Sequence, residues 1–98
     1  MTTERREGVF QVERTVRAAP LWVAGRVLEG SVRVGDSLES EGGRARFRVG
    51  GIDVYGRQLP EVVGGTVAAL HLEPEPGASA AADDALARGA RLSLAAAP

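Results

Sequence analysis

Apolar and polar residues alternate with a period of two along most of this sequence. Phe10 and Val12 alternate with polar neighbours in residues 9–17, and the alternation resumes in residues 21–28 beyond Pro20. Successive side chains of a strand point to opposite sides, so this period predicts half-buried β-strands rather than helices. In the first stretch, one side is expected to carry Phe10, Val12, Arg14 and Val16.

Glycines divide the rest of the sequence into further short strands. We expect turns at Glu29-Gly30, Gly35-Asp36, Gly42-Gly43 and Gly64-Gly65, and a bulge at Gly50-Gly51. Residues 58–63 and 66–72 are expected to form a strand pair, and residues 90–94 a last short strand. Residues 73–82 are expected to form a loop, followed by at most one short helical turn near residues 83–88. Six or seven short strands joined by glycine turns predict an all-β fold, a small barrel.

The hairpin at Gly42-Gly43 has a register that the sequence specifies. A two-residue type I′ turn needs positive φ at both positions, which two glycines supply. Counting outward from the turn pairs Glu41 with Arg44, Ser40 with Ala45, Glu39 with Arg46 and Leu38 with Phe47. Opposite charges then face each other on one side and large apolar residues on the other. A shift of one residue would disrupt both sides, so we expect this register.

Length and composition describe one globular domain. The 98 residues are 44% hydrophobic and 26% charged, with a net charge of −1. We expect a barrel at residues 9–95, preceded by an arm at 1–8 and followed by a tail at 96–98. No apolar run approaches the roughly 20 residues that span a bilayer, and no signal peptide is visible. A cytoplasmic protein without a membrane partner is therefore expected. All twelve basic residues are Arg, and Lys, Asn and Cys are absent.

Four segments of the sequence follow the order of motifs in a known family. Residues 25–36 read GRVLEGSVRVGD, residues 49–52 VGGI, residues 58–65 QLPEVVGG and residues 83–92 DDALARGARL. The first resembles the G-R-hydrophobic-x-x-G-x-V-x-V-G-D stretch in the second domain of translational GTPases such as elongation factor Tu. The others are similar to that domain's mid-barrel turn, its approach to the next strand and its closing segment. The resemblance covers nearly the whole chain and implies a closed antiparallel barrel with Greek-key elements.

The resemblance does not extend to GTP hydrolysis. A nucleotide site of this kind needs a glycine loop ending in Lys, and guanine is read by an Asn-Lys-x-Asp motif. Without Lys or Asn, these 98 residues contain neither motif. We therefore expect a barrel standing without a GTPase domain, with no GTP, no other cofactor and no enzymatic activity. The turn at Gly64-Gly65-Thr66 also lacks the acidic residue and Asn that help tRNA-carrying members hold the aminoacyl end.

Three arginines of the hairpin admit two interpretations. Arg44, Arg46 and Arg48 are spaced about 6.6–7 Å apart on one side of a strand, which suits the backbone of RNA. However, Glu41 and Glu39 face two of them across the hairpin, which indicates neutralised pairs. Arg48, opposite Ser37, is left as the candidate contact of this group.

Two further sites are candidates for binding a partner. In residues 21–28, Trp22 and Arg26 share the side opposite Val23 and Val27, so they are expected on the outside if the valines line the core. An exposed Trp beside an Arg is typical of an interface hot spot or a base-stacking platform. The alternative is that the loop of residues 73–82 or the N-terminal arm covers Trp22. Tyr55 and Arg57 lie in a loop, where barrels often place contacts, although Gly56 is also compatible with an ordinary turn.

Catalytic and metal chemistry find little support in the sequence. His71 is the only His, and it lies within a strand without a second ligand nearby. Nothing in the spacing of Ser, His and Asp residues indicates a triad. We therefore expect a non-catalytic binding module that engages a protein or RNA in a translation-related context. The alternative is a structural or regulatory homo-oligomer, such as a homodimer, that does not bind RNA.

Overall fold

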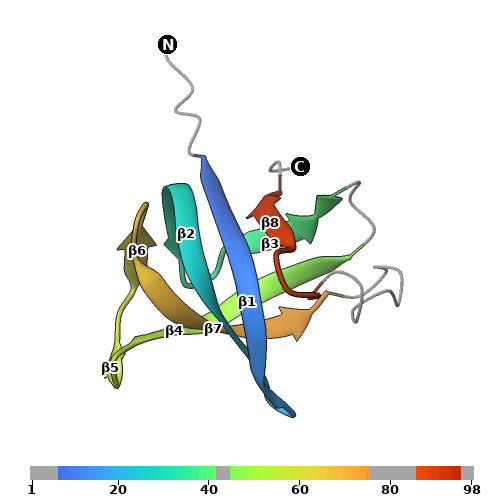
Figure 1. Ribbon diagram of the computed structural model, residues 1–98, viewed down its shortest axis with the longest axis horizontal. Helices are drawn as coiled ribbons and strands as arrows, with labels where there is room; N and C mark the ends of the chain where they lie inside the picture. Colours follow the sequence, from blue (N-terminus) through green and yellow to red (C-terminus); the bar gives the residue numbers. More distant parts are fainter. Residues whose placement is uncertain (1–6, 42–44, 76–85, 96–98) are drawn as a thin grey trace.

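The computed structural model describes residues 7–41, 45–75 and 86–95, which form eight β-strands and no helix (Figure 1). The strands are β1 (Gly8–Ala18), β2 (Leu21–Arg33), β3 (Ser37–Ser40), β4 (Arg46–Val54), β5 (Arg57–Gln58), β6 (Glu61–Val63), β7 (Val67–Pro74) and β8 (Arg91–Leu94). All their pairings are antiparallel. The all-β prediction is confirmed.

Six of these strands close into a barrel. The hydrogen-bonded order runs β1-β8-β3-β4-β7-β2, and β2 pairs with β1 to complete the ring. The two remaining strands are short: β6 pairs with the end of β2, and β5 with the end of β4. The six or seven expected strands thus correspond to a six-stranded ring with two short additions. The helical turn expected near residues 83–88 lies partly outside the described residues, and Leu86–Gly89 forms turns.

Inward-facing residues of the ring fill its interior. Phe10 and Phe47 are the largest, with 0% and 1% of their surfaces exposed. Around them pack buried aliphatic residues of every strand in the ring: Val12, Val23, Val27, Leu38, Val49, Ile52, Leu70, Leu72 and Leu92. Burying each of the larger side chains stabilises the fold by about 1.5–3 kcal/mol. Neighbours of these residues along each strand point outward, and among them are large apolar residues such as Val16 and Val67, which are 49% and 38% exposed.

The turn expected at Glu29-Gly30 is wrong. β2 continues through these residues to Arg33, bending at Gly30, whose φ is 67°. A Cβ at Gly30 would overlap the carbonyl oxygen of Glu7, so the bend also brings β2 close to the chain entering β1. The first part of β2 pairs with β1 and β7, whereas the last part pairs with β6. Gly30 therefore redirects a strand rather than ending it.

The strand pair expected across Gly64-Gly65 is also wrong. β6 and β7 do not pair with each other, because both pair with β2, at Ser31–Val63 and at Arg26–Val67. The N–H groups of Gly64 and Gly65 donate to carbonyl oxygens of β2 at 2.8 and 2.7 Å. The connection between β6 and β7 is thus held against the bend of β2. It links β6, which pairs with the last part of β2, to β7, which pairs with the first part.

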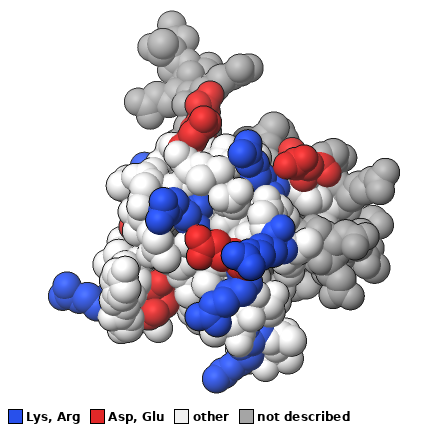
Figure 2. All heavy atoms as spheres, in the orientation of Figure 1, with Lys and Arg blue, Asp and Glu red and all other residues white. Residues whose placement is uncertain are grey.

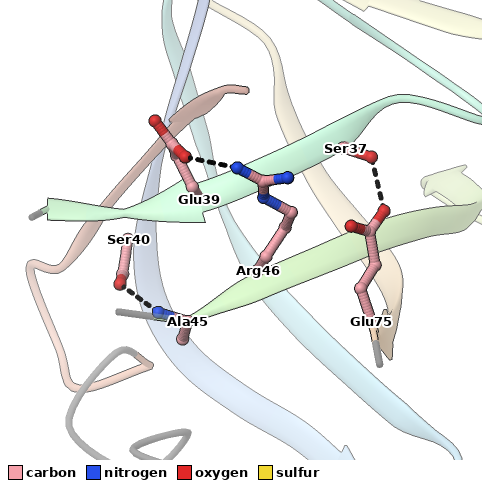
Figure 3. Close-up of polar contacts among 6 residues, drawn as sticks. All are labelled: Ser37, Glu39, Ser40, Ala45, Arg46 and Glu75. Carbon is pink, nitrogen blue, oxygen red and sulfur yellow. Dashed lines mark hydrogen bonds and ion pairs between the residues drawn. The ribbon is translucent and has the colours of Figure 1, made fainter. Parts of the chain in front are cut away.

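The predicted register of the β3–β4 hairpin is confirmed. Leu38 lies opposite Phe47, and Glu39 opposite Arg46, with the carboxylate and guanidinium 3.2 Å apart (Figure 3). The Ala45 N–H donates to the buried Ser40 hydroxyl at 3.0 Å. The Glu41–Arg44 pair and the turn at 42–43 lie partly outside the described residues. The bulge predicted at Gly50-Gly51 is confirmed by the register shift between Val49 and Gly51.

Across the ranges given above, no helix is long and apolar enough to cross a bilayer.

Candidate binding face around Trp22

β1 contains two bulges, and the first of them places Arg14 on the outer face, to which the alternating pattern did not assign it. The register of β1 on β2 shifts between Val12 and Arg14 and again between Thr15 and Arg17. As a result, Arg14 lies opposite Ala24 and Arg17 opposite Trp22. Directly opposite residues of an antiparallel pair project to the same side. Both arginines are exposed, so the expectation that Arg14 shares the side of Phe10 and Val12 is wrong.

Trp22 lies on the outside of the barrel, half-buried against its neighbours. It pairs with Arg17 of β1 on one side and with His71 of β7 on the other. The indole stacks on the imidazole of His71, with ring centroids 5.3 Å apart and planes inclined by 19°. A Cβ at Gly51 would lie 3.5 Å from the indole Cη2, so the indole extends across β7 toward the bulge of β4. The alternative that the loop of residues 73–82 or the N-terminal arm covers Trp22 falls mostly on residues 76–82 and 1–6, which lie outside the described residues.

A groove of about 390 Å³ opens beside the indole. Trp22, Arg17 and Val16 line one side, Asp53 and Gln58 of the β4–β5 hairpin line the other, and Ala69 forms the floor. Val16 is 49% exposed, so the expectation that it shares the side of Phe10 is wrong. The Asp53 carboxylate accepts the Gly56 N–H at 3.2 Å, which fixes it at the base of the turn. We call this hollow the Trp22 groove. It combines an aromatic ring, a guanidinium, a carboxylate and an amide around a small apolar floor.

Arg26 lies on the same face as Trp22, two positions beyond Ala24 on the outer side of β2. It is exposed and lies opposite Gln11 on β1 and Val67 on β7. Arg48 is exposed on β4, opposite Ser37 as predicted and opposite Glu73 on its other side. The β7 strand therefore separates Arg48 from Trp22. The structure brings Arg26 close to the Trp22 groove and leaves Arg48 at the border of the face.

Tyr55 and Arg57 form the tip and the return of the β4–β5 hairpin. Tyr55 is 91% exposed, with a φ of 50°, and is followed by Gly56 with a φ of 82°. Arg57 pairs with Val54, so it projects to the side opposite Asp53 and Gln58. Tyr55 thus lies exposed at the end of the hairpin that forms one side of the groove, whereas Arg57 points away from the groove.

Of the described arginines outside this face, Arg33 and Arg46 are ion-paired, whereas Arg48 and Arg57 are not. Arg46 pairs with Glu39 at 3.2 Å, and Arg33 pairs with Glu61 at 2.5 Å. Among the residues that the structure describes, Arg14, Arg17 and Arg26 take part in no ion pair. Figure 2 shows Arg side chains spread over this face of the molecule, with acidic ones among them. The face therefore retains guanidinium groups that are available to an anionic partner.

The described parts of the chain contain no group of three or more His, Cys, Asp or Glu residues that would hold a metal ion. The His71 imidazole stacks on the indole of Trp22.

Sequence reasoning had singled out Trp22 and Arg26 but missed Arg14, Arg17 and Gln58. The signal for Arg14 was present, because a charged residue at a position counted as core indicates a break in the alternation. Gln58 reaches the groove through its pairing with Asp53. That pairing depends on the turn at Tyr55-Gly56; an ordinary turn was one of the two interpretations of this segment, but the sequence did not indicate the strand pair that it joins.

Comparison with known proteins bears on the fold. No protein-family model matches the sequence, and no curated protein matches it. Among solved structures, GDP-bound aIF5B from Aeropyrum pernix is similar with a TM-score of 0.72 and 23% identity over 92% of this chain. Translation elongation factor SelB from Methanococcus maripaludis matches with a TM-score of 0.71 and 18% identity over 96% of it.

A bacterial selenocysteine-specific elongation factor matches with a TM-score of 0.67 and 25% identity over 89% of the chain. The matches span only 15%, 20% and 14% of the three larger proteins. In each, the matched part is a barrel domain and not the catalytic domain. The structural neighbours are thus translational GTPases, and this chain resembles one β-barrel domain of such proteins.

Proposed function

We propose that this barrel is a non-catalytic binding module that acts in translation and binds single-stranded RNA at the Trp22 groove. The observation that carries the proposal is the Trp22–His71 stack beside Arg17, with Arg14 and Arg26 on the same face. The similarity to barrel domains of translation factors supports the translational context. The proposal concerns binding only and assigns no chemical step to the barrel.

The residues of the groove match the requirements of a single nucleotide. An aromatic ring supplies a stacking surface for a base, and base–aromatic stacking contributes about 1–3 kcal/mol. Arg17 lies beside that ring and carries the charge that a phosphate needs. The Asp53 carboxylate and Gln58 amide on the opposite wall present acceptors and donors to the edge of a base. The stacked His71 restricts the indole, which reduces the loss of side-chain entropy that binding would otherwise cost.

The binding experiment uses the intrinsic fluorescence of the protein. Trp22 is the only tryptophan, so any change in emission reports on the groove itself. Titration with an unstructured RNA of about twelve nucleotides should quench this emission at micromolar concentrations in low salt. The affinity should fall as salt rises, because each neutralised phosphate releases a counterion. An absence of quenching at low salt would refute RNA binding at this groove.

Two arginine variants test which charges contribute. Arg17→Gln removes a guanidinium from the groove wall and should weaken RNA binding and reduce the salt slope by about 0.7. Arg46→Gln is the matched control, since its guanidinium is already paired with Glu39 on the β3–β4 hairpin. Equal losses in both variants would indicate a general charge effect and contradict a role of the groove.

Self-association and protein binding are the other outcomes of these measurements. A homodimer through the same face would shift the sedimentation mass from 10.2 kDa to twice that value without RNA. Trp22→Ala would then restore the monomer. If the protein is monomeric and no RNA quenches Trp22, a protein partner becomes the interpretation to test.

A further inference from the structure

The outer face that carries Trp22 continues across β1 to β8, the last strand of the barrel, and arginines lie along the whole of this face. Gln11 of β1 lies opposite Arg26 of β2 on one side and opposite Arg91 of β8 on the other. These three residues therefore form a row across three neighbouring strands, all projecting outward. We call the five arginines of this surface the arginine face: Arg14, Arg17, Arg26, Arg88 and Arg91. β1 crosses the front of the barrel in Figure 1, and Figure 2 shows blue side chains gathered over the same face.

A cleft of about 560 Å³ lies within the arginine face, between β1 and the turn that follows Leu86. Gln11, Val12, Glu13, Arg14, Arg88 and Gly89 line it. Two backbone hydrogen bonds hold its walls together, from the Val12 N–H to Ala90 at 2.8 Å and from the Gly89 N–H to Val12 at 2.7 Å. The turn thus extends the β1–β8 ladder, and the cleft lies on an ordered part of the barrel.

The side chains of the cleft fit a phosphate group. Arg14 and Arg88 present two guanidinium groups, whose planar donors match the oxygens of a phosphate, and Gln11 adds an amide. Glu13 also lines the cleft, at the bulge of β1, and is the acidic residue among these six. Within the described ranges, neither Arg14 nor Arg88 is ion-paired, with Glu13 or with any other carboxylate.

We propose that this cleft binds a backbone phosphate of the same RNA whose base occupies the Trp22 groove. The inference rests on the proposed function and extends it from one nucleotide to a path. Arg14 links the two hollows, because it lines the cleft and lies in the row of Ala24 and Ala69, the floor of the groove. Along β2, the row of Trp22 lies about 13 Å from the row of Arg26, and Gln11, which shares that row, lines the cleft. A ligand that reaches both hollows is therefore an RNA strand rather than a mononucleotide.

The test compares RNA length between two single variants. Arg88→Gln changes only the cleft, at an exposed position in a turn, and Arg17→Gln changes only the groove. The ligands are a nucleoside monophosphate and a single-stranded RNA of about twelve nucleotides, with Trp22 emission and RNA anisotropy as readouts. Arg88→Gln should lower the affinity for the oligonucleotide about fivefold or more and reduce the salt dependence of that affinity by about 0.7 in slope. The affinity for the mononucleotide should stay unchanged. Arg46→Gln serves again as the control.

Each outcome separates this inference from the proposed function. If RNA binds and Arg17→Gln weakens it, but Arg88→Gln leaves the oligonucleotide unaffected, the cleft proposal is wrong and the groove proposal stands. If Arg88→Gln weakens mononucleotide and oligonucleotide equally, the two hollows are not successive positions on one strand. If inorganic phosphate or polyglutamate competes as well as RNA at equal charge, the cleft is a general anion site. If no RNA binds, both proposals fail.

Discussion

Gly25 lies in the core of the barrel and has no room for a side chain, so Gly25→Ala tests the packing directly. Gly25 lies on the inner side of β2, opposite Val12. A Cβ there would overlap the carbonyl oxygen of Gln11 and come within 2.8 and 2.9 Å of two ring carbons of Phe10. Because backbone and a buried ring are both in the way, β1 and β2 would have to separate or Phe10 would have to leave its place.

The expected cost follows from these two contacts. Overpacking a well-filled core usually costs about 1–3 kcal/mol, and the backbone overlap places Gly25→Ala at the upper end, near 3 kcal/mol. For a domain of this size, about 1 kcal/mol corresponds to a shift of 4–8 °C in Tm. We therefore expect Tm to fall by about 12 °C or more. The φ of Gly25 is not in the left-handed region, so conformational freedom alone does not account for such a loss.

Urea unfolding followed by Trp22 emission, together with thermal unfolding by circular dichroism, measures the effect. Gly51→Ala is the matched control, because its added Cβ would meet Trp22 and His71 at 3.5 and 3.7 Å, which is ordinary contact. Gly51→Ala should cost less than about 1 kcal/mol. If the two variants lose the same stability, or if Gly25→Ala loses less than about 0.5 kcal/mol, the result would contradict the close contact between β1 and β2 at Gly25.

Two further substitutions test the hairpin tip and the core. Tyr55→Asn should stabilise the barrel by about 0.5–1 kcal/mol in urea unfolding, because Asn tolerates the positive φ that Tyr55 adopts at 50°; a loss of stability would indicate that the tyrosine makes a structural contact. Leu70→Ala should destabilise the barrel by about 2–5 kcal/mol, since Leu70 is fully buried in the core. A cost below about 1 kcal/mol would contradict its burial.

The elements that sequence predicted correctly are those specified locally. The β3–β4 hairpin follows from two glycines and from the charges that flank them, so its register could be read without knowledge of the rest of the chain. The outward position of Trp22 follows from Val23 and Val27, which are both buried and mark the inner side of β2. In both cases the residues that determine the structure lie within a few positions of one another.

The predictions were wrong where the pairing of strands depends on segments that are distant in the sequence. Residues 61–63 and 67–74 are separated by a short glycine connection that looks like a hairpin, yet both find their partner in β2. The inward assignment of Arg14 failed because alternation counts residues and cannot count bulges. The arginine face depends on the same bulges and on the pairing of β1 with β8, so it could not be assembled from the order of residues alone.

The closure of the ring by β8 has a consequence for how the chain folds. β8 joins β1 at positions such as Val9 and Ser93, and it joins β3 on its other edge. Contacts between such distant positions are formed only after the entropy of closing a long loop is lost, which slows the folding of β-barrels to milliseconds or longer. Until residues 91–94 leave the ribosome, β1 and β3 each have an unpaired edge, which is a site for aggregation. The nascent barrel would therefore gain most from chaperone protection just before its last strand is synthesised.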